Sequence, residues 1–145
     1  MNGALHQFGT GMREGSSPPS VSQEITQHQI DHYATASGDL NPIHIDPKFA
    51  AGSHFGKRVA HGMLIAALIS EMMTLSFSCD WLRSGRMKLR FKAPVFPGDI
   101  ATARGVVKSV IEDEASRTII CSVEVVRQTS EIAIAGEASV VVSCG

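Results

Sequence analysis

The stretch RVAHGMLIAALISEMMTLSF, residues 58–77, decides how the chain folds. Its apolar side chains recur on nearly every face of a helix, which is typical of a helix buried in the middle of a protein. They include Val59, Met63, Leu64, Ala67, Leu68, Met72 and Leu75. The sequence therefore predicts one long central helix, over about residues 59–77, that the other elements must cover.

The segments that follow this helix have the composition of β-strands. Residues 85–95 alternate Met87, Leu89 and Phe91 with basic side chains, which predicts a strand with one apolar and one polar face. Three further segments are rich in β-branched residues and are separated by short turns: 98–111, 116–129 and 131–143. One buried helix against one antiparallel sheet is an α+β architecture. The open edges of such a sheet favour pairing with a second chain, so we expect a homodimer.

The chain before the helix divides into an arm and the start of the domain. Residues 1–19 are rich in Gly, Ser and Pro without an apolar period, so we expect a flexible arm outside the core. Residues 20–145 are expected to form a single domain, which this length can fold around one core. Residues 20–26 are expected to contain a short strand.

Two short helices are predicted from their capping residues. Thr26 can cap a helix over residues 27–37, which Gly38 ends. Asp46 can cap a second, shorter helix that begins at Pro47.

Composition excludes several classes of protein. A formal net charge of −1 argues against a nucleic-acid partner, which requires a basic surface. The three cysteines, Cys79, Cys121 and Cys144, are an odd number without CxxC spacing, so we expect no disulfide framework and a reducing cytoplasm. No apolar run reaches the roughly 20 residues that span a bilayer, and the first residues lack the features of a signal peptide. We therefore expect a cytoplasmic protein without a membrane partner.

The stretch SGDLNPIHID, residues 37–46, gathers two carboxylates, an Asn and a His around a Gly and a Pro. With VAHGML (59–64) and KAPVFPGD (92–99), it resembles the MaoC-like branch of the hot-dog fold, which includes the (R)-specific enoyl-CoA hydratases. The motif Gly-Asp-x-Asn-Pro-x-His-x-Asp of that family is complete here. The resemblance runs from about residue 21 to the end of the chain, and it implies an antiparallel sheet wrapped around a long central helix, in a homodimer whose sheets join.

The resemblance also implies an activity, the reversible (R)-specific hydration of a trans-2-enoyl-CoA to an (R)-3-hydroxyacyl-CoA. This reaction needs a base that takes a proton from water, an acid that protonates C2, and donors that stabilise charge on the thioester oxygen. Asp39 and His44 correspond to the family's water-activating pair. Asn41 and Pro42 are suited to hold their loop in place.

Gly62 corresponds to the family's oxyanion-hole residue. At the start of the long helix its N–H has no acceptor within the helix, and the absence of a side chain lets a thioester approach the backbone. His61 precedes it and is expected to shape the same wall of the site.

The remaining candidate residues concern substrate binding. Small Ala66 and Ala67 leave room for an acyl tail one turn into the helix. CoA phosphates need cationic partners, for which the candidates are Lys57, Arg58, Lys88 and Arg90.

We expect no metal and no other cofactor. His28 and His32 share a helix face at i,i+4 spacing, but the sequence offers no evident third ligand, so we interpret them as solvated side chains.

Alternative functions remain open from the sequence. A dehydratase of 3-hydroxyacyl groups on acyl carrier protein would use the same motif. A hot-dog thioesterase commonly carries an acidic residue on the central helix, and here that helix offers Glu71. A non-catalytic partner subunit would be expected to have lost Asp39 or His44.

Overall fold

A five-stranded antiparallel sheet forms the larger layer of the computed structural model, which describes residue 9 and residues 11–143. The strand order is β1-β3-β4-β5-β2. The strands are β1 (Val21–Glu24), β2 (Arg86–Phe91), β3 (Ile100–Glu112), β4 (Ser116–Arg127) and β5 (Ile132–Ser143). The expected α+β architecture is therefore confirmed, and the short strand expected near residue 21 pairs with β3.

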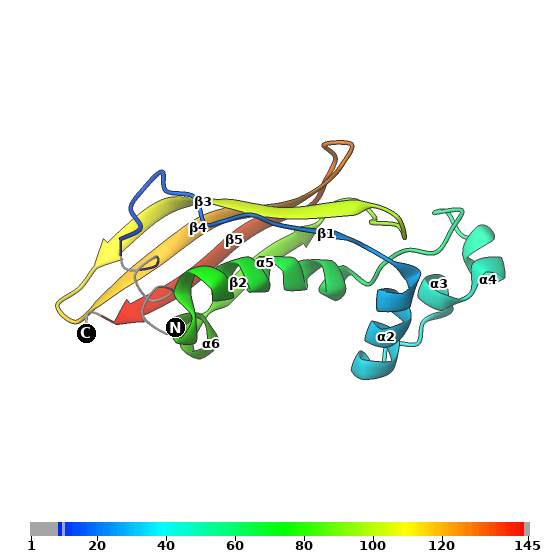
Figure 1. The fold of residues 1–145 in the computed structure, drawn as a ribbon, viewed down its shortest axis with the longest axis horizontal. Helices are drawn as coiled ribbons and strands as arrows, with labels where there is room; N and C mark the ends of the chain where they lie inside the picture. The colour runs from blue at the N-terminus through cyan, green and yellow to red at the C-terminus, as the bar shows by residue number, and fades with distance from the viewer. Residues whose placement is uncertain (1–8, 10, 144–145) are drawn as a thin grey trace.

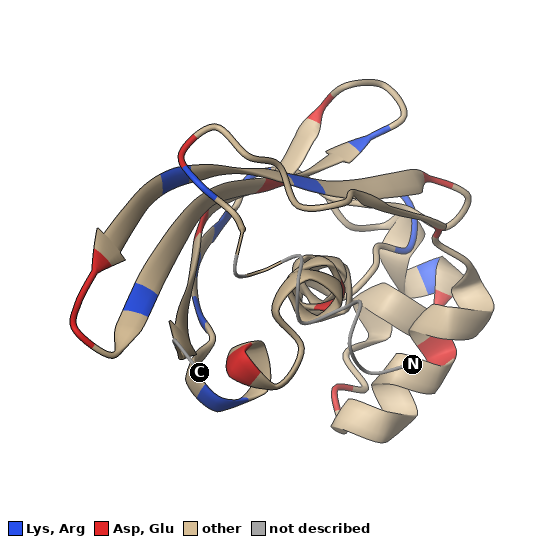
Figure 2. Cartoon of the chain, turned by 60° about the vertical axis from the view of Figure 1, so that its left-hand side comes forward, with Lys and Arg blue, Asp and Glu red and all other residues tan. Residues whose placement is uncertain are grey.

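Helix α5 (Gly62–Phe77) lies along the concave face of the curved sheet (Figures 1 and 2). Its fully buried side chains, Ile69, Met72 and Met73, belong to one core cluster with the inward side chains of β3, β4 and β5. The helix begins three residues later than expected, because Ala60 donates its N–H to the Val95 carbonyl in an extended segment. Among residues 11–143 no helix is long and apolar enough to cross a membrane.

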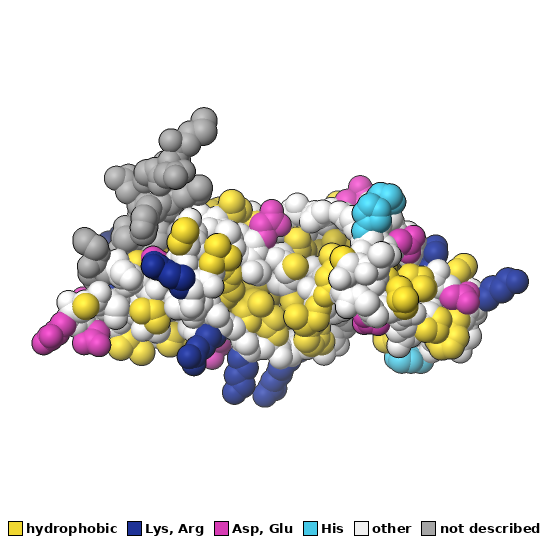
Figure 3. All heavy atoms as spheres, turned by 90° about the horizontal axis from the view of Figure 1, so that it is seen from below, with side chains coloured by type: hydrophobic (Ala, Val, Ile, Leu, Met, Phe, Trp, Pro, Cys, Tyr) yellow, Lys and Arg dark blue, Asp and Glu magenta, His cyan; other side chains and the backbone are white. Residues whose placement is uncertain are grey.

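The opposite face of α5 is not covered by residues 11–143. Met63 is 59% exposed, and Leu75 is also exposed. Apolar side chains gather along the underside of the molecule in Figure 3. The sheet thus explains why one face of this helix is apolar, while the other apolar face lies open within the part of the chain that the structure describes.

Three helices gather beyond the N-terminal end of α5: α2 (Gln27–Ser37), α3 (Pro42–Ile45) and α4 (Pro47–Ala51) (Figure 1). The predicted caps are confirmed. Thr26 forms a capping box with Gln29, Gly38 ends α2 in the left-handed region at φ 78°, and Asp46 accepts from the first N–H groups of α4. Helix α6 (Cys79–Ser84), which follows α5 directly and packs beside β5, was not expected from the sequence.

The expectation that residues 1–19 lie outside the core is wrong for residues 11–19. Gly15 donates its N–H to the Val107 carbonyl, and Val107 donates its own to Ser16. Met12 is buried in the main cluster, and its carbonyl accepts from Arg117. The segment therefore covers the outer edge of β3 where β1 does not reach. Residues 1–8 and 10 of the predicted arm, and Cys144, lie outside the described residues.

The turn before β3 is held by the buried carboxylate of Asp99. Arg127 donates from Nε to Oδ2 at 2.8 Å and from Nη2 to Oδ1 at 3.1 Å, and Gln128 donates to Oδ1 at 2.7 Å. The N–H of Phe96 also donates to Oδ2. Burial raises the pKa of Asp99, but these hydrogen bonds and the Arg127 charge outweigh it and hold the pKa below its usual value. The network fixes the loop over residues 92–99, which forms one wall of the site.

Candidate active site

The loop between α2 and α4 is shaped by short-range hydrogen bonds. Asp39 Oδ1 accepts from the Asn41 N–H at 3.2 Å. Asn41 Oδ1 accepts in turn from the Ile43 N–H at 3.0 Å and caps α3, where Pro42 is the first residue. Such side-chain-to-backbone bonds replace a regular backbone ladder in turns. Asn41 and Pro42 thus lie where they restrict the path of the chain between Asp39 and His44.

Asp39 and His44 face each other across a gap. His44 Nε2 lies 3.9 Å from Asp39 Oδ2, and the side chains are 12% and 53% exposed, respectively. His44 Nδ1 lies 2.8 Å from the Val59 carbonyl, which can only accept, so Nδ1 carries a proton. In the neutral imidazole Nε2 is then a free acceptor. The gap is too long for a direct hydrogen bond, but one water can bridge it.

His61 contacts both members of this pair. Its Nε2 lies 3.0 Å from the main-chain carbonyl of Asp39. Its ring stacks on that of His44, with centroids 3.7 Å apart and planes 25° from parallel. The side chain is 2% exposed, and a tilted Tyr33 ring packs against it. His61 is therefore a buried residue that lines the same cleft as Gly62.

Gln27 and Tyr33, both on α2, were not recognised in the sequence as site residues. Gln27 Nε2 donates to the His44 carbonyl at 2.8 Å and to Asp31 Oδ1 at 2.8 Å. The helical pattern of residues 27–37 does not indicate which face packs against the next loop, so neither residue carried a signal.

Gly62 is the first residue of α5. His61, the N-cap, makes no side-chain cap hydrogen bond, so the N–H of Gly62 has no intrahelical acceptor and no cap. A Cβ at this position would lie 2.8 Å from Cε1 of Phe91. The close approach of this aromatic ring explains locally why the position suits a glycine.

Two clefts meet at Gly62 and Phe91. The first, of about 370 Å³, contains the side chains of Asp39 and His61. Its lining is Tyr33, Ser37, Asp39, His61, Gly62, Met63 and Phe91. The second, of about 290 Å³, is mostly apolar. Its lining is Phe55, Val59, Ala60, Gly62, Ile65, Phe91, Lys92, Ala93, Pro94, Val95, Ala133 and Ile134. The ring of Phe91 stands where the two clefts adjoin.

The small residues expected to make room for an acyl tail do not line either cleft. Ala66 is buried in the core, and Ala67 lies on the open face of α5, one turn beyond Met63. The prediction of a helix here is confirmed, but its sequence pattern does not indicate which face meets the clefts. Met63, Gly62 and Ile65 line them instead.

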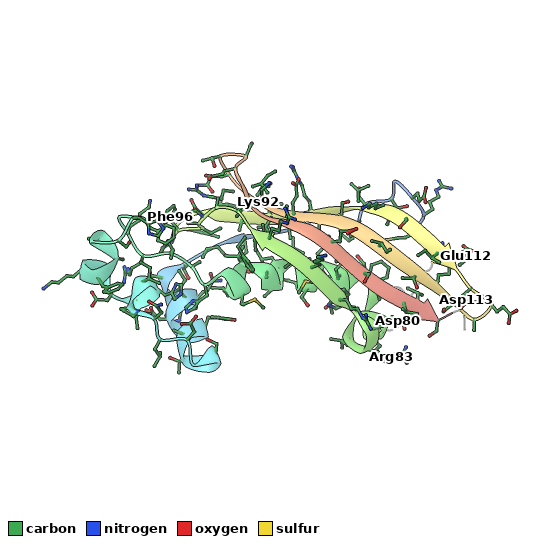
Figure 4. The ribbon with its side chains drawn as sticks, turned by 180° about the vertical axis from the view of Figure 1, so that it is seen from behind. Asp80, Arg83, Lys92, Phe96, Glu112 and Asp113 are labelled. Atoms are coloured by element: carbon green, nitrogen blue, oxygen red, sulfur yellow. The ribbon has the colours of Figure 1, made fainter. Side chains whose placement is uncertain are left out.

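The predicted cations separate into two groups. Side chains alternate along β2, and Phe91 packs on the start of α5, so Lys88 and Arg90 point to the opposite, outer face of the sheet, away from both clefts. Lys57 lies at the cleft end of the molecule, with its amine 4.3 Å from the Phe96 ring centroid, and Arg58 is half-buried beside it in sequence. Figure 4 shows Phe96 and Lys92 at this same end.

Asp39, His44 and His61 could together offer three metal ligands, with atoms within 4.8 Å of one another. The geometry disfavours a metal there, because the lone pairs of two nearly parallel, stacked imidazoles run side by side, whereas tetrahedral ligands must converge on the ion. His28 and His32 are exposed and pack against each other on α2.

Comparisons with known proteins agree with this arrangement. Residues 12–130 match the family of MaoC-like domains. The chain is 33% identical over 120 residues to the (R)-specific enoyl-CoA hydratase of Aeromonas caviae, covering 83% of this chain and 88% of that protein. It is 33% identical over 138 residues to the enzyme of the same name from Rhodospirillum rubrum, covering 95% and 92%.

Similarity extends to the three-dimensional structure. The solved (R)-hydratase of A. caviae superimposes with a TM-score of 0.79 at 30% identity, over 90% of this chain and 96% of that one. The family match, the relatives and the wrapped central helix agree. The chain therefore belongs to the MaoC-like family of hydratases and dehydratases and has the hot-dog fold.

Proposed function

We propose that this chain catalyses the reversible hydration of a trans-2-enoyl-CoA to an (R)-3-hydroxyacyl-CoA. The observation that carries this proposal is the pair of Asp39 Oδ2 and His44 Nε2, which face each other 3.9 Å apart beside the uncapped start of α5. The (R) configuration is supported by relatives named (R)-specific enoyl-CoA hydratase.

The geometry suits activation of one water. Asp39 Oδ2 and the bare Nε2 of His44 can each accept one hydrogen of a water that lies about 2.8 Å from both. Its lone pairs then point away from the dyad, toward substrate. One acceptor takes a proton as the water oxygen forms a bond to C3.

The electron pair of the C2–C3 π bond then moves toward the thioester and gives an enolate. The Gly62 N–H, supported by the dipole of α5, stabilises the negative oxygen. The protonated member of the dyad delivers a proton to C2, and the thioester carbonyl is restored. Since water and proton come from the same dyad, both add to one face of the double bond.

CoA is the favoured carrier of the acyl group. Lys92 lines the apolar cleft, and Lys57 lies near it on the Phe96 ring. Together with Arg58 they are candidates to pair with the CoA phosphates. An acidic carrier protein could meet the same cations, so hydration of crotonyl-CoA is to be compared with that of crotonyl-acyl carrier protein. A preference for the carrier protein would replace the CoA assignment.

A second copy of the chain completes the sheet in our proposal. The outer edge of β3 is covered by β1 and by residues 15–16, whereas β2 is an end strand with no partner beyond it among residues 11–143. Exposed Met87 on β2 and the open face of α5 would be buried by such a partner. Light scattering should give the mass of a dimer, and Leu75→Glu should weaken it. A wild-type monomer at micromolar concentration would contradict this assembly.

The cytoplasm is our proposed location. Cys79 and Cys121 are free thiols, and burial raises the pKa of the Cys121 thiol to about 11, which makes it unreactive. Free thiols suit a reducing compartment. Fractionation of the native cells should recover the protein in the cytosolic fraction.

The activity is tested by mixing the protein with crotonyl-CoA and a longer trans-2-enoyl-CoA. Loss of the conjugated absorbance, with an (R)-3-hydroxyacyl product on chiral analysis, is the expected result. Release of free CoA thiol would indicate a thioesterase instead, although Glu71 lines neither cleft. An (S) product, or no reaction with CoA or carrier-protein substrates, would overturn the proposal.

A further inference from the structure

We infer that His61 is a positioning residue that holds Asp39 and His44 in the relative positions that the reaction needs. This inference rests on the proposed function for its kinetic consequence, but its structural content can be tested without activity. Its basis is that one buried imidazole has a separate contact to each member of the dyad.

The first contact fixes the main chain of Asp39. The Asp39 carbonyl can only accept, so the 3.0 Å contact requires a proton on His61 Nε2. The bond joins two residues 22 positions apart, and it ties the dyad loop to the start of α5. Asp39 is otherwise an exposed residue on a turn, so this bond limits how far its carboxylate can drift from His44.

The second contact fixes the ring of His44. The stacked His61 ring covers one face of His44 at 3.7 Å, and the Val59 carbonyl holds Nδ1. Together these two contacts restrict rotation of the His44 ring, so its Nε2 stays directed at Asp39. The Tyr33 ring contacts His61 in turn in a tilted arrangement, so the ring contacts extend to α2.

The surroundings select one tautomer of His61. Its Nδ1 is buried and has no hydrogen-bond partner in the described part of the chain. A proton placed there would bury an N–H without an acceptor, which costs free energy. The neutral Nε2–H form is therefore the one that fits, whereas His44 carries its proton on Nδ1. The two stacked rings hold opposite tautomers.

The two contacts can be removed separately. His61→Phe keeps an aromatic ring over His44 but loses the donor to Asp39, while His61→Gln keeps a donor and loses the stack. His61→Ala loses both. His32→Gln, which removes an exposed imidazole from α2, is the matched control.

We expect kcat for enoyl-CoA hydration to fall at least about tenfold in the Phe and Gln variants and about a hundredfold in the Ala variant. KM should stay within about threefold of wild type, because the His61 contacts act on the dyad and not on the CoA. Thermal unfolding of each variant is measured alongside. A folded His61→Ala protein with wild-type kcat would overturn the inference.

The imidazole ¹⁵N spectrum of the wild-type protein gives a readout that needs no variant to fold. It should show His61 as the Nε2–H tautomer and His44 as the Nδ1–H tautomer. A Nδ1–H tautomer at His61 would overturn the inference, since the contact to Asp39 would not be a hydrogen bond. A wild-type protein that hydrates no enoyl thioester, yet shows these tautomers, would refute the proposed function. It would leave standing the inference that His61 positions Asp39 and His44.

Discussion

Replacing Gly62 with alanine tests how a thioester reaches the start of α5. The added Cβ would lie 2.8 Å from Cε1 and 2.9 Å from Cδ1 of Phe91, whereas ordinary contacts begin at 3.4 Å. The ring must therefore retreat by several tenths of an ångström. Phe91 is 55% exposed and can do so, and we expect the free energy of unfolding to change by no more than about 1 kcal/mol.

The effect on catalysis should be much larger. The methyl group occupies the approach to the Gly62 N–H, and loss of one oxyanion donor typically slows a reaction by about 10² to 10³. We expect kcat/KM for crotonyl-CoA to fall about a hundredfold, measured from the conjugated absorbance, and Gly62→Val to fall further.

Gly52→Ala is the matched control, since its Cβ would meet only the Phe49 carbonyl at an ordinary 3.6 Å. It should keep the wild-type rate and unfolding temperature. A folded Gly62→Ala enzyme with an unchanged rate would refute the assignment of Gly62 to the thioester oxygen.

Three further perturbations test the framework around the site. Asp99→Asn breaks a buried ion pair with Arg127 and should lower the free energy of unfolding by about 3 kcal/mol at neutral pH, measured in urea. Because the folded-state pKa of Asp99 is lowered, its contribution to the free energy of unfolding is present above the unfolded pKa near 3.9 and is lost as pH falls through the folded pKa. The free energy of unfolding of the variant should therefore fall less steeply with acid than that of wild type. The same pH dependence in both proteins would contradict this. Gly136→Ala would place a Cβ against the Lys88 carbonyl of β2, so it should loosen that strand and expose its amides to hydrogen exchange, and unchanged protection would speak against the pairing. Lys92→Ala should raise KM for enoyl-CoA more than for an enoyl-pantetheine thioester, and an equal rise for both would remove Lys92 from phosphate binding.

Local patterns in the sequence predict most of the elements, although not α3 or α6, and the dyad loop is identified by its resemblance to the family motif. Thr26, Gly38 and Asp46 begin or end helices through contacts within a few residues, so their chemistry is readable in order along the chain. Asp39 and His44 are five positions apart, and the family resemblance pairs them; in the structure their side chains face each other at 3.9 Å.

Contacts between distant segments were not readable. His61 bonds to a carbonyl 22 residues away, and Arg117 reaches the carbonyl of Met12 across 105 residues. No periodicity encodes such pairs, so the sequence alone predicts a free arm where residues 12, 15 and 16 in fact contact the core and β3. Lys88 and Arg90 were misplaced for a related reason, since alternation along a strand does not say which face meets the substrate.

The most direct test of the account compares wild type, Asp39→Asn and His44→Gln in the hydration of crotonyl-CoA. Both substitutions remove a group that can take a proton from water while leaving the core untouched. The account predicts that each variant keeps the wild-type circular dichroism spectrum and loses at least about a hundredfold in rate, the usual contribution of a general acid–base group. A near-normal rate in either folded variant would contradict the proposed dyad.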